Sequence, residues 1–252
     1  MNTTIDKKEI DFFSKLSDQW WNLQGLYSPL HKLADVRIKF ILRNLERKKN
    51  NLDLSPLKNI SCIDLGCGGG ILSERLARMG GNITAIDASK ESIQVAKNHA
   101  KTSGLKVNYI HTSSSDFLKK NKNKKFDLVI ASEIIEHVND RDKFLSDISS
   151  LSKKGSIIII TTINSSFISI FFSKFMAENV LKILPQGTHD IKKFVSPNAL
   201  AEEAKKYSIF FDDVVGFQPQ FSINSLLNKQ IESFKITNYP IVNYGLAGLK
   251  LS

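Results

Sequence analysis

The residues with the clearest chemical meaning form a glycine turn that an acid precedes. Asp64, Gly66, Gly68 and Gly70 follow the spacing D-x-G-x-G-x-G, and a helix-like stretch comes directly after them. Glycine lets a ligand approach the backbone closely, because it has no side chain and tolerates left-handed conformations. Asp64 can organise this turn and attract a positively charged group, directly or through water. Its alternative role is that of a simple turn residue that caps a helix.

The spacing of the glycines argues against a dinucleotide. The G-x-G-x-x-G pattern, which holds a pyrophosphate at a helix N-terminus, needs its third glycine where this chain has Ile71 or Ser73. An acid in front of the glycines instead suits a ligand with a charged amino-acid end. We therefore expect S-adenosylmethionine at Asp64, Gly66 and Gly68.

Two further acids follow the next two predicted strands. Asp87 closes the second strand, where a carboxylate can accept hydrogen bonds from both hydroxyls of a ribose. Its alternative role is to cap the helix that begins after Ala88 and Ser89. Asp116 follows the third strand and faces either the adenine amino group or solvent, as a plain loop acid.

The fourth predicted strand leads into a cluster of two carboxylates and an imidazole. Glu133, Glu136 and His137 stand at positions i, i+3 and i+4, so one helical turn would place them on a common face. Such a set can hold a divalent cation, and its oxygen-rich character favours magnesium. A metal there would make a bound catechol easier to ionise. The alternative is a solvated acidic turn with a capping histidine.

Strand and helix patterns alternate between residues 60 and 162. Nearly continuous apolar strands separated by helices predict a parallel sheet that is covered on both faces. We expect an α/β fold with a doubly wound, mostly parallel sheet of seven strands and ligands at the carboxyl ends of these strands. The predicted strands are residues 60–64, 83–86, 107–110, 126–131 and 157–160, with two more in 207–251, and the predicted helices are 72–79, 91–102 and 141–151.

The whole chain, residues 1–252, is predicted to be a single domain with four parts. Residues 1–50 form a helical cap, 51–162 a cofactor-binding core, 163–195 an apolar insert and 196–252 the last strands. Within the insert, residues 165–184 are rich in Phe, Ile, Leu and Met. They form either an amphipathic helix at a membrane interface or a buried helix that closes the site.

Composition limits the functional classes. The net charge is +10, but the basic runs at 47–49 and 119–125 contain no interleaved aromatic residues, so solvated loop charge is favoured over a nucleic-acid surface. Cys62 and Cys67 are too close for a disulfide across a strand end, which indicates reduced, intracellular cysteines. The start of the chain is polar and does not resemble a signal peptide. No segment reaches the roughly 18 apolar residues that a membrane span needs.

Longer motifs give the chain a family resemblance. It resembles the ubiquinone-biosynthesis O-methyltransferases, within the class I S-adenosylmethionine-dependent methyltransferases, over nearly its full length. The glycine motif indicates only the superfamily, whereas the tryptophan pair and the Gly-Thr-His-Asp stretch indicate the quinone branch. The residues that carry the resemblance are Trp20, Trp21, Arg37, Asp64–Glu74, Asp87, Glu133–Val138, Thr162–Asn164 and Leu184–Asp190.

The resemblance implies a set of site residues and an activity. Arg37, Gly66, Asp87 and Ser132 would contact S-adenosylmethionine, and Glu133, Glu136 and His137 would be magnesium ligands. The family methylates a polyprenyl catechol and the demethylated quinol on a phenolic oxygen. Its lipid substrates imply a cytoplasmic enzyme that touches the inner membrane peripherally and works within a quinone-biosynthesis complex, with no nucleic acid as partner.

The expected mechanism is direct methyl transfer to a phenolate. An unperturbed phenol titrates near pKa ~10, so a base or a metal must remove its proton near neutral pH. His137 on a metal and His189 as a base are the candidates. The rival functions are a tRNA or rRNA methyltransferase, another small-molecule class I methyltransferase, and a module that binds S-adenosylmethionine or lipid without catalysis.

Overall fold

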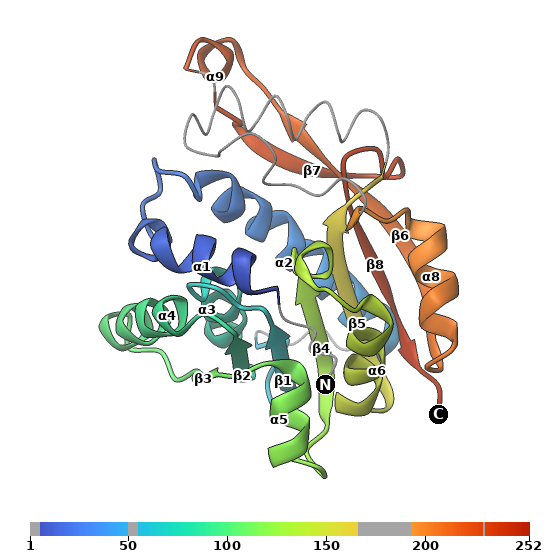
Figure 1. Ribbon diagram of the computed structural model, residues 1–252. Coiled ribbons are helices and arrows are strands. Elements are labelled where there is room, and N and C mark those ends of the chain that lie inside the picture. Colours follow the sequence, from blue (N-terminus) through green and yellow to red (C-terminus); the bar gives the residue numbers. More distant parts are fainter. Residues whose placement is uncertain (1–5, 50–54, 166–192, 229) are drawn as a thin grey trace.

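A computed structural model describes residues 6–49, 55–165, 193–228 and 230–252 (Figure 1). The elements up to the fourth strand are α1 (Lys7–Lys15), the 3-10 helix η1 (Ser17–Gln19), α2 (Ser28–Lys49), β1 (Ser61–Leu65), α3 (Ile71–Arg78), β2 (Asn82–Asp87), α4 (Lys90–Thr102), β3 (Asn108–His111), α5 (Ser114–Lys120) and β4 (Phe126–Ser132). They are followed by the 3-10 helix η2 (Ile135–His137), α6 (Arg141–Leu151), β5 (Ser152–Ile163), α8 (Pro197–Lys205), β6 (Ile209–Gln220), α9 (Ile223–Leu227), β7 (Ser233–Thr237) and β8 (Asn243–Lys250).

These strands form one sheet in the order β3-β2-β1-β4-β5-β8-β6-β7. The pairs from β3 to β5 are parallel, whereas β8 is antiparallel to both β5 and β6, and β7 is antiparallel to β6. The order reverses at β1, from which the chain winds outward in both directions, so the predicted doubly wound α/β class is confirmed. Ligands bind at such a reversal, outside the carboxyl ends of the strands.

The sheet has eight strands among the described residues, one more than the predicted seven. The prediction placed two strands in 207–251, where the structure has three, β6, β7 and β8. Of these, β7 is a short edge strand that pairs with the last residues of β6, from Gly216 to Gln220. Its residues are exposed or half-buried and include Lys235 and Thr237, so it lacks the apolar run by which the other strands were recognised. An edge strand can remain polar because only one of its sides is paired.

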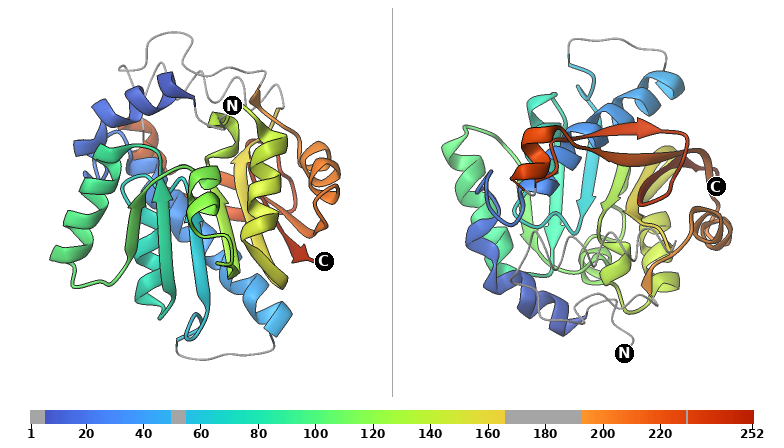
Figure 2. Two further views of the ribbon diagram at one scale, coloured as in Figure 1. Left: turned by 60° about the horizontal axis from the view of Figure 1, so that its bottom comes forward. Right: turned by 90° about the horizontal axis from the view of Figure 1, so that it is seen from above.

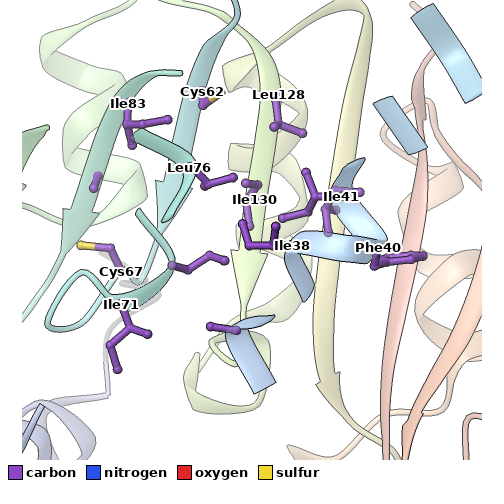
Figure 3. Packing of buried hydrophobic residues seen from close by; sticks show 14 of the residues in the cluster. Ile38, Phe40, Ile41, Cys62, Cys67, Ile71, Leu76, Ile83, Leu128 and Ile130 are labelled. Carbon is purple, nitrogen blue, oxygen red and sulfur yellow. The ribbon is translucent and has the colours of Figure 1, made fainter. Parts of the chain in front are cut away.

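Helices cover both faces of the sheet (Figure 2). Alternate strand residues point to opposite faces, so Leu128 and Ile130 pack with the side chains of α2, α3 and α4, whereas Val129 and Ala131 pack with α5, α6 and α8. Figure 3 shows the first cluster, in which Ile38, Phe40 and Ile41 of α2 meet the strand side chains. The long α2 is thereby held rigidly against the sheet.

Local signals explain where the helices begin. Ser89, Ser113, Asp140 and Ser196 each cap a helix, because their side-chain oxygens accept the N–H three residues later. The helices predicted at 72–79, 91–102 and 141–151 agree with α3, α4 and α6 to within one or two residues. Among the described residues, no helix has the length and apolar character required to cross a bilayer.

The N-terminal helices lie over the carboxyl ends of β1 and β2, as Figure 1 shows. The β6–β7 hairpin and α9 extend beyond the same edge of the sheet. Described residues from all four predicted parts of the chain thus join this sheet or pack near it. The division into these parts stays a prediction.

Candidate active site

A cavity of about 390 Å³ lies at the carboxyl edge of the sheet, within the size range of small-molecule sites. Its walls come from the glycine turn after β1, the end of β2, the segment after β4, the N-terminal helices and the β6–β7 hairpin. The site residues predicted within the described chain, Arg37, Asp64, Gly66, Gly68, Asp87, Ser132, Glu133, Glu136 and His137, all contribute to its lining. The topology therefore brings this set together.

The glycine turn has the backbone conformation that its sequence requires. Gly66, Gly68 and Gly70 have φ values of 72°, 52° and 86°, in the left-handed region that glycine tolerates best. The N–H groups of Gly66 and Cys67 both donate to the carbonyl of Ile86, at 2.8 and 3.0 Å. The turn after β1 is thereby fastened to β2 and held open towards the cavity.

The indole of Trp20 packs directly on this turn. A Cβ at Gly68 would lie 2.5 Å from the Trp20 ring, so a larger residue has no room there. Trp20 Nε1 donates to Ser92 Oγ at 3.1 Å, and the indole stacks on the ring of Tyr27 with centroids 4.0 Å apart. Sequence reasoning used Trp20 only as a family marker and missed its role as a wall of the site.

Trp21 fastens the same turn from outside. Its Nε1 donates to the carbonyl of Gly69 at 2.9 Å, and its ring stacks on His99 with centroids 3.4 Å apart. His99 in turn contacts Glu74 Oε1 through Nδ1 at 2.7 Å. The tryptophan pair therefore joins the N-terminal segment to α3, α4 and the glycine turn. The adjacent pair of aromatic residues was the one signal in the sequence for this contact.

Asp64 ends β1 as a buried carboxylate with few partners. It is 2% exposed and accepts a hydrogen bond from Ser73 Oγ at 2.6 Å. Burial raises its pKa from the ordinary 3.8 to about 6, and the bond from Ser73 opposes this rise. A ligand ammonium group would stabilise the charged form. The geometry thus agrees with a role beyond that of a turn cap.

Asp87 ties the glycine turn to β2. Its Oδ2 accepts the N–H of Gly68 at 2.8 Å, and its Oδ1 accepts the N–H of Ser89 at 2.8 Å. Ser89 caps α4, so the alternative role of Asp87 as the cap of this helix is wrong. Burial raises the pKa of Asp87. Each of its oxygens keeps a second acceptor site for a ligand hydroxyl.

Ser132 and Asp116 differ in their relation to the cavity. Ser132 lines it, and its hydroxyl shares a hydrogen bond with Thr161 Oγ1 at 3.0 Å. Asp116 stands in the first turn of α5 with its side chain 51% exposed, where it pairs with Lys119 and accepts from Ser113 Oγ. At this corner the described lining consists of Thr112, Ser113 and Ser114.

A buried ion pair crosses the floor of the cavity. Arg37 reaches from α2, and its Nη2 lies 2.9 Å from Glu133 Oε1. Glu133 also accepts from Thr161 Oγ1 at 3.2 Å and from Asn243 Nδ2 at 2.9 Å. Burial raises the pKa of Glu133, which the nearby Arg37 opposes. Burial likewise lowers the pKa of Arg37, with Glu133 as its main counter-charge.

The three predicted magnesium ligands line the same cavity but do not lie on one helical turn. The expected helical turn is only the short η2, Ile135–His137, and Glu133 lies outside it with a left-handed φ of 51°. The Glu133 N–H continues the strand pairing by donating to the Thr161 carbonyl at 2.8 Å, and the left-handed φ is what excludes Glu133 from a right-handed helix. Glu136 accepts instead from Thr162 Oγ1 at 2.7 Å.

The donor set consequently does not fit a metal in this arrangement. Among the described residues, no group of three or more His, Cys, Asp or Glu side chains is disposed to hold an ion. The guanidinium of Arg37 already supplies the positive charge beside Glu133. We therefore derive no catalytic step through magnesium. His189 and residues 166–184 lie outside the described residues, so their predicted roles stay predictions.

Comparisons with known proteins agree with this fold and cavity. Residues 56–211 match the family described as "Methyltransferase domain". A ubiquinone biosynthesis O-methyltransferase from Pelagibacter ubique (strain HTCC1062) is 43% identical over 96% of this chain and 96% of its own length. Another from Bartonella tribocorum is 35% identical over 85% of this chain and 87% of its own.

The chain belongs to the ubiquinone biosynthesis O-methyltransferases. The predicted S-adenosylmethionine-dependent O-methyltransferase of ubiquinone biosynthesis is thereby confirmed, in preference to an RNA methyltransferase or a module without catalysis. The fold is also that of solved methyltransferases. Magnesium protoporphyrin IX methyltransferase from Synechocystis PCC 6803 aligns with a TM-score of 0.64 at 16% identity, covering 97% of this chain and 100% of that one.

Proposed function

We propose that the cavity binds S-adenosylmethionine along the carboxyl edge of β1 and β2. The ammonium group lies beside Asp64, the amino-acid carboxylate meets Arg37, and the ribose hydroxyls donate to Asp87. Gly66 and Gly68 give the backbone clearance, with Ser132 beside them. Arg37 supports this placement, because it is the only arginine or lysine among the described residues that line the cavity.

The acceptor occupies the other, apolar part of the same cavity. Among its described lining residues are Ile163, Ile231, Phe234 and Val242. Such a wall favours an aromatic ring with a hydrocarbon tail over a polar acceptor. We assign this part to the phenol or quinol ring of a polyprenyl precursor of ubiquinone, methylated on oxygen.

The reaction is an in-line displacement. The phenolate oxygen attacks the methyl carbon on the sulfonium, the carbon–sulfur bond breaks, and S-adenosylhomocysteine leaves as a neutral thioether. The protein contributes proximity and exclusion of water. The phenol must lose its proton first, and His137 is a described side chain of the lining suited to accept it. His189 is the second candidate for this base.

The observation that carries the proposal is that glycines, acids and Arg37 line the same cavity as a group of apolar side chains. The test incubates the protein with S-adenosylmethionine and a catechol that bears a short prenyl tail. Methylated catechol is the expected product. A parallel reaction contains a chelator. Cofactor binding without methylation of any prenylated phenol or quinol would overturn the assignment of the acceptor.

We further propose that residues 165–184 bring the enzyme to the membrane in which a long-tailed substrate resides. Their apolar composition supports this assignment. Anionic liposomes should raise turnover of a long-tailed acceptor and leave turnover of a short-tailed one unchanged. Equal rates with and without liposomes would contradict membrane delivery. Assembly with other quinone-biosynthesis proteins is part of the same proposal.

A further inference from the structure

Arg37 has fewer partners than a buried guanidinium needs. The residue is 5% exposed, and its contact with Glu133 is an ion pair between single atoms, Nη2 and Oε1, 2.9 Å apart. Neither its Nε nor its Nη2 has a hydrogen-bond partner of good geometry among the described residues. A carboxylate that faced both nitrogens would satisfy them together. Arg37 thus keeps N–H donors for a ligand carboxylate.

Glu133 is held in place by two side chains from neighbouring strands. Asn243 at the start of β8 and Thr161 of β5 both donate to its carboxylate. Its backbone has a left-handed φ of 51°, a conformation that a glutamate adopts only when its surroundings impose it. The side chain is therefore directed to Arg37 from a strained position.

The cofactor of the proposed function carries a carboxylate of its own. Arg37 already has three acids around it, namely Asp64, Glu133 and Glu136, which all act on its charge. A fourth carboxylate at the same guanidinium would face like-charge repulsion unless one acid withdrew. Glu133 is the acid in direct contact with Arg37, so it is the one that the incoming carboxylate displaces.

We propose that Glu133 occupies Arg37 in the empty enzyme in place of the cofactor carboxylate and is displaced when the cofactor binds. Glu133 is thus a positioning residue that stabilises the empty site and lowers cofactor affinity. Its release changes the acceptor side of the cavity, where Asn243 lies beside Val242. This inference rests on the proposed function.

The test measures binding of S-adenosylhomocysteine and of 5′-methylthioadenosine, which has the same nucleoside but no carboxylate. Glu133→Gln keeps the shape and the acceptor oxygen and removes the charge that competes for Arg37. We expect it to bind S-adenosylhomocysteine roughly 10-fold more tightly, within the usual range of coupling between two sites. Its affinity for 5′-methylthioadenosine should not change, because that ligand does not reach Arg37.

Two further variants keep the result interpretable. Asn243→Ala frees Glu133 from its empty-state position without altering Arg37, so it should also tighten S-adenosylhomocysteine and spare 5′-methylthioadenosine. Arg37→Met should weaken S-adenosylhomocysteine alone. Circular dichroism shows whether each variant folds. If Glu133→Gln does not fold, the binding result for Asn243→Ala decides the proposal instead.

The remaining outcomes separate this inference from the proposed function. Unchanged or weaker binding of S-adenosylhomocysteine in folded Glu133→Gln would overturn the displacement and leave the proposed function standing. Failure of the unmodified enzyme to bind either ligand would instead overturn the proposed function. Tighter binding of both ligands by Glu133→Gln would show a general effect on the cavity and would also overturn the displacement.

Discussion

The carboxylate of Asp87 accepts the N–H of Gly68 at 2.8 Å, so the end of β2 holds the glycine turn that follows β1. The same carboxylate accepts the N–H of Ser89 through its other oxygen. One side chain thus fixes the turn, the start of α4 and, by our proposal, the cofactor ribose. Binding and local order therefore change together when Asp87 is altered.

Asp87→Asn should weaken binding of S-adenosylhomocysteine about 10-fold or more, because charge-assisted hydrogen bonds become neutral ones. The single amide oxygen also cannot accept both N–H groups that the carboxylate accepts. Titration calorimetry measures the change. Asp116→Asn is the matched control, since its carboxylate is half-exposed and lies off the cavity lining, and it should bind normally. A loss of affinity in Asp116→Asn would instead support the predicted contact of Asp116 with the adenine amino group.

Gly70→Ala should destabilise the protein through both strain and collision. Gly70 has φ 86°, and an added Cβ would lie 2.2 Å from the hydroxyl oxygen of Tyr109. Gly104→Ala supplies the control, because Gly104 has φ 66° with nothing within 4 Å of its added Cβ. We expect a loss of roughly 1 kcal/mol for Gly104→Ala and about 2–4 kcal/mol for Gly70→Ala. Urea unfolding measures both, and equal losses would show that Tyr109 moves aside freely.

Asp64→Asn should stabilise the empty protein at neutral pH. Burial raises the Asp64 pKa from 3.8 to about 6, so the folded state holds a proton that the unfolded state has already released between these values. Stability accordingly falls as the pH rises through this window, and the full penalty, on the order of 2–3 kcal/mol, applies above pH ~6. The asparagine avoids it, so the gain in melting temperature should vanish towards pH ~4. A gain that is the same at every pH would contradict this explanation.

The same variant should lose cofactor affinity, because a neutral amide attracts the ammonium group of S-adenosylmethionine weakly. The unmodified enzyme should bind the cofactor more weakly as the pH falls below about 6, where Asp64 takes up its proton. Calorimetry at several pH values tests both statements. Stability and affinity then change in opposite directions at one residue, as is common at functional sites.

The base is tested by a pair of histidine variants. If His137 removes the phenol proton, His137→Gln should lower kcat by about 10²-fold or more at neutral pH, and raised pH should partly restore the rate. His189→Gln should then retain the pH profile of the unmodified enzyme. The reverse result would assign the base to His189. A small effect of both variants would show that the acceptor reaches the site already ionised.

The sequence was sufficient for the parallel half of the fold. Runs such as Ile157–Ile160 are buried on both faces, and their apolar character alone is enough to mark them as strands. The sequence pattern does not predict the short α5 or the edge strand β7, because each is polar on most sides and is stabilised by contacts with its neighbours. The antiparallel position of β8 between β5 and β6 also depends on pairing that no local pattern records.

The site likewise contains residues whose place the sequence predicts and residues whose place it does not. Asp64, Gly66, Gly68 and Asp87 follow directly from spacing at strand ends, because topology brings these ends together. The predicted place of Glu133 on a helical face is wrong, because its φ is left-handed and the helix begins only at Ile135. The contact of Trp20 with Gly68 joins residues 48 positions apart and was beyond sequence reasoning.

The β6–β7 hairpin supplies Ile231 and Phe234 to the cavity from one margin of the sheet, while the glycine turn and Asp87 serve it from strands towards the opposite margin. The two contributions rest on one packed cluster, because Phe234 of the hairpin packs against the same buried group as Trp20 and Cys67 beside the glycine turn. Exchange of this hairpin between relatives would therefore alter acceptor preference and also disturb the packing behind the donor site. Substrate range and donor affinity are thus expected to evolve together in this enzyme, through one shared core.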